Sequence, residues 1–157
     1  MVQIALFQPE IAQNVGTLLR FGACMGTPIH IIEPCGFLMT DQKLRRAGMD
    51  YSDLACMHRH ISWNEFLINR PNGRLIATSP VASKSYTNFD FAPNDILLLG
   101  QESIGLPEDI LSTSEHVVSI PMIDGRRSLN LALSAGIITS EALRQINMLP
   151  QQGAINA

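Results

Sequence analysis

Two glycine-containing segments in the last third of the chain carry the strongest chemical pattern. In each, a short apolar run gives way to a polar turn: Ile96–Leu99 precedes Gly100–Pro107, and Val117–Met122 precedes Asp124–Asn130. Glycine lets a backbone approach a ligand closely, and in open α/β sheets ligands bind beyond the carboxyl ends of the strands. The two segments therefore predict two walls of one small-molecule pocket, where we expect a cofactor to bind.

Arg20 is a second candidate for chemistry. It is the only Asp, Glu, Lys or Arg between Glu10 and Glu33, and it lies within the apolar segment Val15–Met25. Such an arginine is often a snorkelling or ion-paired side chain at a helix edge. Here Asn14 stands at the start of the predicted helix, where free backbone N–H groups favour anions such as phosphate. This context favours a role for Arg20 in binding an anionic acceptor.

Other cofactor chemistries fit the sequence poorly. Gly100 and Gly105 have the spacing of a phosphate loop, but no Lys-Ser or Lys-Thr pair follows. The first apolar run leads into Gln8–Glu10 rather than a glycine-rich dinucleotide motif. His58 and His60 could share one face of a strand, but no third ligand fits the pattern. We therefore expect no metal, and histidines that face the surface or a nucleic acid.

Apolar runs and helical patterns alternate along the chain and must position these residues. Strands that are uniformly apolar and alternate with helices indicate a mostly parallel sheet covered on both faces. We therefore predict an α/β fold in a single domain spanning residues 1–157. The predicted strands are Ile4–Phe7, Ile29–Ile32, Leu75–Thr78, Ile96–Leu99 and Val117–Ile120, with a sixth near Ala55–His58. The predicted helices are Asn14–Met25, Asp41–Ala47, Trp63–Asn69, Pro107–Leu111 and Leu129–Asn147.

Composition narrows the class of protein. Of the 157 residues, 46% are hydrophobic and 16% charged, which is typical of a well-packed chain with an apolar face to bury. No apolar run has the length of a membrane span, and the N-terminus lacks the pattern of a signal peptide. Cys24, Cys35 and Cys56 have no paired-ligand spacing and are expected to be reduced thiols. These features predict a cytoplasmic protein.

Charge is distributed unevenly. The net charge of −3 argues against indiscriminate nucleic-acid binding. Residues 43–74 nevertheless hold six Lys or Arg against three acids, whereas residues 85–125 hold seven acids and no Lys or Arg. A polyanion would therefore meet one side of the molecule. Solvated charged faces explain the same pattern equally well.

Three motifs, taken in order, resemble those of the SPOUT, or trefoil-knot, RNA methyltransferases. Asn14–Arg20 is similar to the first motif and Gly100–Pro107 to the second. Ile120–Met122 and Arg127–Asn130 together are similar to the third. The resemblance implies a C-terminal trefoil knot, which places the motif loops side by side.

Two further segments, Ile31–Phe37 and Leu44–Tyr51, are similar to the small YibK-like subfamily, and the similarity extends from about Ile4 to about Gln145. That subfamily methylates the ribose of the wobble nucleotide of leucine tRNAs. The resemblance implies S-adenosylmethionine-dependent 2′-O-methylation of tRNA at a wobble cytidine or modified uridine. Two alternatives stay open: the same reaction on another RNA such as rRNA, and a non-catalytic protein that binds RNA or an adenosine ligand.

The resemblance also assigns the cofactor site. In the family's pattern, Thr78, Gly100, Ile120 and Ser128 edge the slot that holds the adenine of S-adenosylmethionine. Ser128 could instead be the N-cap of the last helix, or serve both purposes. Glu102 is either an acid near a helix start or an electrostatic partner of the sulfonium or of Arg20.

The acceptor side is assigned in the same way. In the family the arginine that matches Arg20 lies beside the ribose to be methylated, and its catalytic role is assigned either to proton removal or to the positioning of phosphate and ribose. Positioning suits a guanidinium better, because removing a proton would demand a very large fall in its pKa. Asn14, Arg45 and Arg46 are expected to contact the anticodon arm of tRNA. The predicted helix Leu129–Asn147 is apolar nearly all round, which favours a homodimer. The family is dimeric through the equivalent helix.

The sequence departs from better-known relatives at three positions. They carry Pro and Arg where this chain has Gln101 and Ile104, and a tyrosine of the last helix where it has Ser140. That tyrosine is associated with RNA handling, whereas the cofactor motifs are intact. The resemblance therefore implies methyl transfer more firmly than a particular RNA target.

Overall fold

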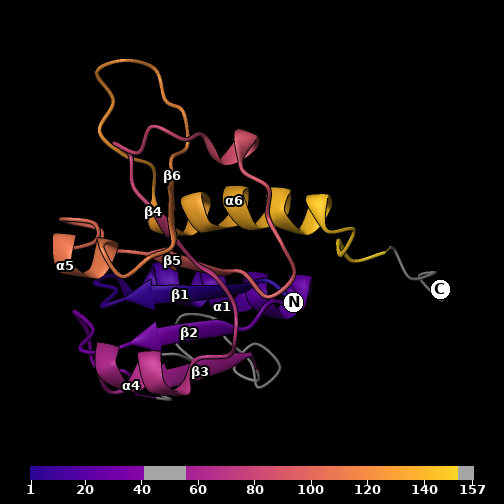
Figure 1. Ribbon diagram of the computed structural model, residues 1–157. Helices are drawn as coiled ribbons and strands as arrows, with labels where there is room; N and C mark the ends of the chain where they lie inside the picture. The colour runs from indigo at the N-terminus through magenta and orange to yellow at the C-terminus, as the bar shows by residue number, and fades with distance from the viewer. Residues whose placement is uncertain (41–55, 152–157) are drawn as a thin grey trace.

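A parallel sheet forms the centre of the molecule. The computed structural model describes residues 1–40 and 56–151, in which six strands follow the order β3-β2-β1-β5-β4-β6 (Figure 1). Each neighbouring pair is parallel. The strands are β1 (Gln3–Phe7), β2 (Ile29–Ile32), β3 (Met57–His60), β4 (Leu75–Thr78), β5 (Ile96–Leu99) and β6 (His116–Val118). The predicted α/β class is confirmed.

Helices cover both faces of this sheet because its strands alternate between two apolar layers. Ile4 and Leu6 of β1 belong to one cluster of buried residues, and Ala5 and Phe7 belong to the other. The first cluster includes side chains of α1 and α6, and the second includes side chains of α4 and α5. The helical segments are α1 (Ala12–Met25), α4 (Trp63–Asn69), the 3₁₀ turn η1 (Tyr86–Asn88), α5 (Glu108–Leu111) and α6 (Leu131–Gln145).

Most predicted boundaries agree with the structure, and two strands are displaced. The strand expected near Ala55–His58 is β3, which runs from Met57 to His60. The strand expected at Val117–Ile120 is β6, which ends at Val118 because Ser119 leaves the ladder and donates its N–H to the Lys84 carbonyl at 2.8 Å. The predicted helix Asp41–Ala47 lies outside the described residues.

The last helix begins later than the sequence indicates. Asn130 caps α6, since its side-chain oxygen accepts the N–H groups of Ala132 at 2.8 Å and Leu133 at 3.2 Å. Ser128 stands two residues before this cap and therefore does not serve as the N-cap. One amide oxygen satisfies two of the N–H groups that a helix start leaves unpaired.

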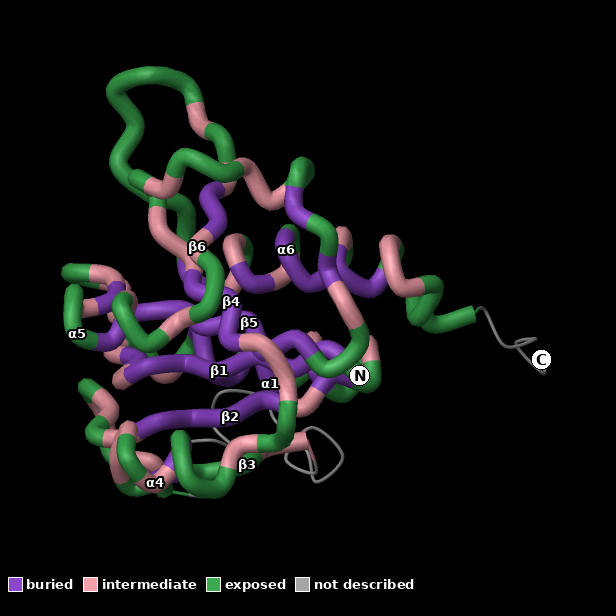
Figure 2. Tube along the Cα trace, viewed as in Figure 1, coloured by how far each residue is buried: buried purple, intermediate pink, exposed green. Residues whose placement is uncertain are grey.

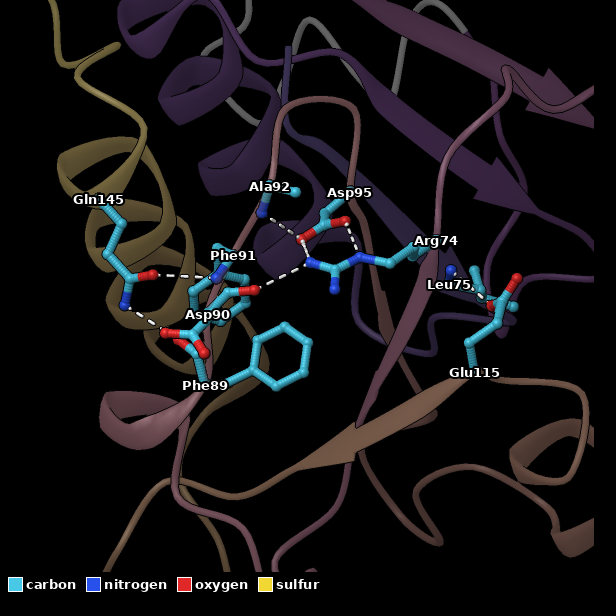
Figure 3. Close-up of polar contacts among 9 residues, drawn as sticks. All are labelled: Arg74, Leu75, Phe89, Asp90, Phe91, Ala92, Asp95, Glu115 and Gln145. Atoms are coloured by element: carbon cyan, nitrogen blue, oxygen red, sulfur yellow. Dashed lines mark hydrogen bonds and ion pairs between the residues drawn. The ribbon is translucent and has the colours of Figure 1, made fainter.

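The segment between η1 and β5 is fastened to α6 and to Arg74, the residue that precedes β4 (Figure 3). The Gln145 side chain accepts the N–H of Phe91 at 2.9 Å and donates to the carbonyl of Phe89 at 3.0 Å. Arg74 donates two hydrogen bonds to the buried carboxylate of Asp95, at 2.8 and 2.7 Å. These bonds hold the segment in place, and the threading of a knot remains a prediction.

No described helix is long and apolar enough to cross a membrane. Cys24, Cys35 and Cys56 are free thiols. Burial raises the pKa of the Cys35 thiol to about 11, so this thiol stays protonated at neutral pH.

Candidate functional site

A cavity of about 750 Å³ opens at the carboxyl ends of β4, β5 and β6. Its walls are formed by residues 78–81, 99–106 and 127–131, which follow these strands or begin α6. This is the edge at which parallel sheets bind ligands. Figure 2 shows that the loop between β6 and α6 is exposed over most of its length, in contrast to the buried strands below it.

The four residues predicted to hold a cofactor all line this cavity. Thr78 ends β4, Gly100 follows β5, Ile120 follows β6 and Ser128 precedes α6. The hydroxyl of Thr78 donates to the carbonyl of Leu98 at 3.3 Å, which ties β4 to β5 at the cavity floor. Folding therefore brings together four residues that lie far apart in the sequence. Their contact with a cofactor remains a prediction.

Gly100 is required by the loop itself. A Cβ atom at this position would lie 2.2 Å from the carbonyl carbon of Gly105 and 2.3 Å from the nitrogen of Leu106. The loop folds back here because Gln101 and Gly105 exchange two backbone hydrogen bonds of 3.0 and 2.9 Å. The space left by the missing side chain is thus filled by backbone. This corrects the sequence-based explanation, in which a ligand fills it.

A chain of polar side chains joins the three motif segments. Glu102 accepts the side-chain N–H of Asn14 at 2.9 Å, and Asn14 accepts that of Asn130 at 2.9 Å. Glu102 also accepts the backbone N–H groups of Glu10 at 2.7 Å and Ile11 at 3.2 Å. A carboxylate at the start of α1 is stabilised by the helix dipole. The structure confirms that Glu102 is an acid at a helix start, and the helix is α1; an interaction of Glu102 with a sulfonium stays a prediction.

Of the residues predicted to meet RNA, the structure describes Asn14 and Arg20, and of these two Asn14 lines the same cavity as the four cofactor residues. Asn14 lines the cavity, is 7% exposed and uses both ends of its amide within the protein. Arg20 lies on the exposed side of α1 and does not line this cavity. The apolar surroundings expected around it belong to the opposite side of α1, where Leu18 and Leu19 are buried. Arg45 and Arg46 fall outside the described residues.

A second cavity, of about 830 Å³, lies between α1 and α6. Phe21 contributes from α1, and Leu133 and Ile137 contribute from α6 with 60% and 37% of their surfaces exposed. Asn14 and Asn130 line both cavities. The hydrogen-bonded asparagine pair therefore separates the first cavity from an open apolar face.

Three histidines cluster away from both cavities, on β2 and β3. His30 is 3% exposed and joins His60 at 2.9 Å and the side-chain oxygen of Gln3 at 2.7 Å. Because that oxygen can only accept, His30 donates from Nε2 and accepts at Nδ1 from His60. Burial lowers the pKa of His30 to about 4. No group of three or more His, Cys, Asp or Glu among residues 1–40 and 56–151 is arranged to hold a metal ion.

The predicted surface role fits only one of the two histidines singled out in the sequence. His58 is exposed, but His60 is buried at 6% exposure, because its imidazole pairs with His30 on the neighbouring strand. Sequence reasoning missed His30, although a polar residue inside the apolar run Ile29–Ile32 was a signal that it needed a partner.

A family model and a relative of known name each match most of this chain. A family model described as the SpoU rRNA Methylase family matches residues 1–140. A tRNA (cytidine(34)-2′-O)-methyltransferase from Beijerinckia indica subsp. indica is 46% identical over 148 residues, which are 93% of this chain and 92% of that protein.

Two solved structures share the fold. One, determined to explain the 2-OH methylation of C/U34 on tRNA, has a TM-score of 0.85 at 42% identity and covers 92% of this chain and 95% of its own. The other is an AdoMet-bound rRNA methyltransferase from Sinorhizobium meliloti, with a TM-score of 0.80 at 25% identity, covering 91% of this chain and 56% of its own. Since the family model spans most of its length and a full-length relative shares nearly half of its residues, this chain belongs to the SpoU rRNA methylase family.

Proposed function

We propose that this protein transfers a methyl group from S-adenosylmethionine to the 2′-hydroxyl of nucleotide 34 of tRNA. Its family membership and the activity for which the Beijerinckia relative is named support the reaction and the position. The observation that carries the proposal is the single cavity lined by Thr78, Gly100, Ile120 and Ser128. More specifically, we propose that the substrate nucleotide is a wobble cytidine or modified uridine in leucine tRNAs. We also propose that the protein acts in the cytoplasm and consists of a single domain.

The cavity has properties that suit S-adenosylmethionine. Its volume of about 750 Å³ falls within the usual range for small-molecule sites. Leu99, Leu106 and Ile138 give it apolar walls that could enclose an adenine ring. S-adenosylmethionine supplies a methyl group on a positively charged sulfonium. The Glu102 carboxylate lines the same cavity, and its negative charge would attract the positively charged sulfonium.

Methyl transfer is an in-line displacement, so alignment of the acceptor hydroxyl is the main task of the protein. A guanidinium donates hydrogen bonds and accepts none. We therefore assign to Arg20 the positioning of the ribose or its phosphate, rather than the removal of a proton. Arg20 follows Thr17 by three residues, on the same side of α1, and Thr17 lines the cavity between α1 and α6.

A homodimer would bring that side of α1 to a shared site. The exposed apolar residues Leu133 and Ile137 of α6 are the surface on which we propose that two copies pair. Since Asn14 and Asn130 line both cavities, the interface would lie directly behind the cofactor cavity. The anticodon arm would then lie across both subunits, with Arg45 and Arg46 of one facing the cavity of the other.

Ribosomal RNA is the second candidate substrate. It is favoured by the description of the family model and by the rRNA methyltransferase from Sinorhizobium meliloti, which is 25% identical. The relative that is named for tRNA is 46% identical over nearly the full length of both proteins. The tRNA substrate is therefore the better supported of the two. A binding protein without turnover would have no need of Arg20 with Asn14, to which we assign the contact with the acceptor.

The proposal is tested by mapping the methylated nucleotide. Purified protein is incubated with methyl-labelled S-adenosylmethionine and either leucine tRNA or rRNA fragments. A matched tRNA with a 2′-deoxynucleotide at position 34, the position named for the relative, lacks the acceptor hydroxyl. We expect label in the tRNA at nucleotide 34 and none in the deoxy control. Label confined to rRNA would transfer the proposal to the second candidate, and cofactor binding without any label would indicate a binding protein.

A further inference from the structure

Ile104 stands at the mouth of the cofactor cavity with 71% of its surface exposed. A single exposed aliphatic side chain is ordinary on a protein surface. Ile104 differs because it lines a cavity at the tip of a loop, and because Val81, on the loop after β4, lines the same cavity and is 89% exposed. Two loops thus present aliphatic side chains at one cavity.

The loop that carries Ile104 is anchored on both sides. Gln101 and Gly105 close it with two backbone hydrogen bonds. Glu102 is bonded to the start of α1, and the backbone N–H and hydroxyl of Ser103 both donate to the carboxylate of Glu10 at 2.8 Å. The residues on either side of Ile104 therefore hold it outward. A side chain presented in this way loses little entropy when a ligand packs on it.

The occupant of this mouth follows from the proposed function, on which this inference rests. For a 2′-hydroxyl to reach the methyl donor, the ribose must enter through the mouth of the cavity. The nucleobase is attached to that same ribose and must lie close to the rim. The flat face of a base is apolar, and its burial against aliphatic side chains is favourable.

We propose that Ile104, supported by Val81, packs against the face of the base of the methylated nucleotide and so positions its ribose. Contact with the face leaves the hydrogen-bonding edge of the base unread. Cytosine and uracil would then be accepted alike, which is the tolerance expressed by C/U34 for the similar solved structure. Ile104 thus responds to the presence of a base on the methylated nucleotide and not to the identity of that base.

The test combines a change in the protein with a change in the RNA. Anticodon stem-loops carry C, U or an abasic ribose at position 34, and kcat/KM is measured for the wild type and for Ile104→Ala. We expect Ile104→Ala to lose about tenfold on C and U equally, mainly through KM, as burial of about two of the three carbon groups that this substitution removes would predict. On the abasic RNA the two proteins should be equal, because the partner of Ile104 is already missing.

Two controls make the outcome specific. Ile68→Ala removes an aliphatic side chain of similar exposure, 81%, from α4 and outside both cavities, and should match the wild type on every RNA. Binding of S-adenosylhomocysteine should be the same for all three proteins. An equal loss on abasic and C34 RNA, a loss of cofactor affinity, or a change in the oligomeric state of Ile104→Ala would each overturn the proposal. A wild type that labels none of the stem-loops but does label rRNA would overturn the proposed tRNA function and this inference with it.

Discussion

Single residues at the cavity are engaged with one another before any ligand binds. Glu102, Asn14 and Asn130 form a continuous chain of hydrogen bonds, and Asn130 also caps α6. A site whose polar groups are already paired needs little rearrangement to bind a ligand. Side chains that only line the cavity, such as Ser134, are therefore the better positions at which to test binding.

Filling the cavity from α6 should block the cofactor. Ser134→Phe introduces a ring into the proposed cofactor site, and we expect the Kd for S-adenosylhomocysteine to rise by about tenfold or more. Ser134→Ala is the matched control, because it leaves the cavity open and should bind as the wild type does. Isothermal titration measures both values. Unchanged affinity in the phenylalanine variant would move the cofactor away from this cavity.

Replacing Arg20 should reduce methyl transfer without reducing the affinity for the cofactor. If it positions the acceptor, Arg20→Ala keeps its affinity for S-adenosylhomocysteine while kcat/KM for tRNA falls by about a hundredfold, since the lost contact is made with the acceptor. Arg20→Lys should recover little, because an ammonium lacks the planar fork of donors. A parallel loss of thermal stability and cofactor affinity would instead mean that Arg20 supports the fold.

Secondary-structure elements decide how the loops and the histidines are placed. The turn after β5 needs Gly100 because its own backbone returns at 2.2 Å from where a Cβ would lie. The pairing of β2 with β3 sets His30 beside His58 and His60, so that a neutral imidazole is buried between strands. Both effects arise from the register of neighbouring elements.

The histidine pair should make the fold sensitive to acid. Burial lowers the pKa of His30 from 6.5 to about 4. Between these two pH values, His30 therefore binds a proton in the unfolded chain but not in the folded chain. The free energy of unfolding should therefore fall as the pH drops from 6.5 towards 4, by up to about 3 kcal/mol. The pKa of His60 is lowered in the same direction, although Glu65 opposes the effect. Urea unfolding at several pH values measures this change.

His30→Gln provides the control for that measurement. Glutamine can donate to Gln3 and accept from His60 but does not titrate. We expect its free energy of unfolding to depend less steeply on pH between 6.5 and 4 than that of the wild type. An equal slope in both proteins would assign the acid sensitivity to other groups.

At the scale of the whole molecule, the open face between α1 and α6 is where we expect a second copy. Leu133→Glu places a charge on this face at a side chain that is 60% exposed in the single chain, so the fold should survive. We expect monomers by light scattering, and weak tRNA binding, since a buried unpaired charge opposes association. Ile68→Glu places the same charge on α4 and should remain dimeric. A fully active monomer would contradict the shared site.

The affinity for tRNA should depend on the salt concentration because of phosphate contacts made by basic residues within 43–74. Each phosphate contact releases counterions, so replacing Arg45 and Arg46 by alanine should lower the slope of log K against log salt by about 1 to 2. Cofactor affinity should not change. Arg59→Ala is the matched control, because Arg59 is paired with Glu33 at 2.7 Å and is expected to contribute less to phosphate binding. An unchanged slope in the double variant would place the RNA on another surface.

The sequence by itself determined the α/β class, nearly all of the described strands and helices, and the pairing of two loops at one cavity, whereas the four residues that line that cavity were implied by the family resemblance. It could do so because burial imposes apolar runs and helical periodicity locally, and because parallel strands bring the loops after them to one edge. The motifs carried the family, since their order and spacing are specific. Elements such as Ile29–Ile32 and Trp63–Asn69 were predictable to the residue.

Only the tertiary structure decided which partner each polar group takes. The Asn130 cap, the Glu102 carboxylate at the start of α1, the burial of His60 and the backbone packed against Gly100 all depend on contacts between the chain's distant segments or on the exact path of a loop. Hydrogen bonds act over about 3 Å and leave no periodic signal in a sequence. The tertiary structure also decided that Arg20 is exposed. The apolar pattern of α1 predicts the buried side of the helix and does not predict what surrounds the residues on its exposed side.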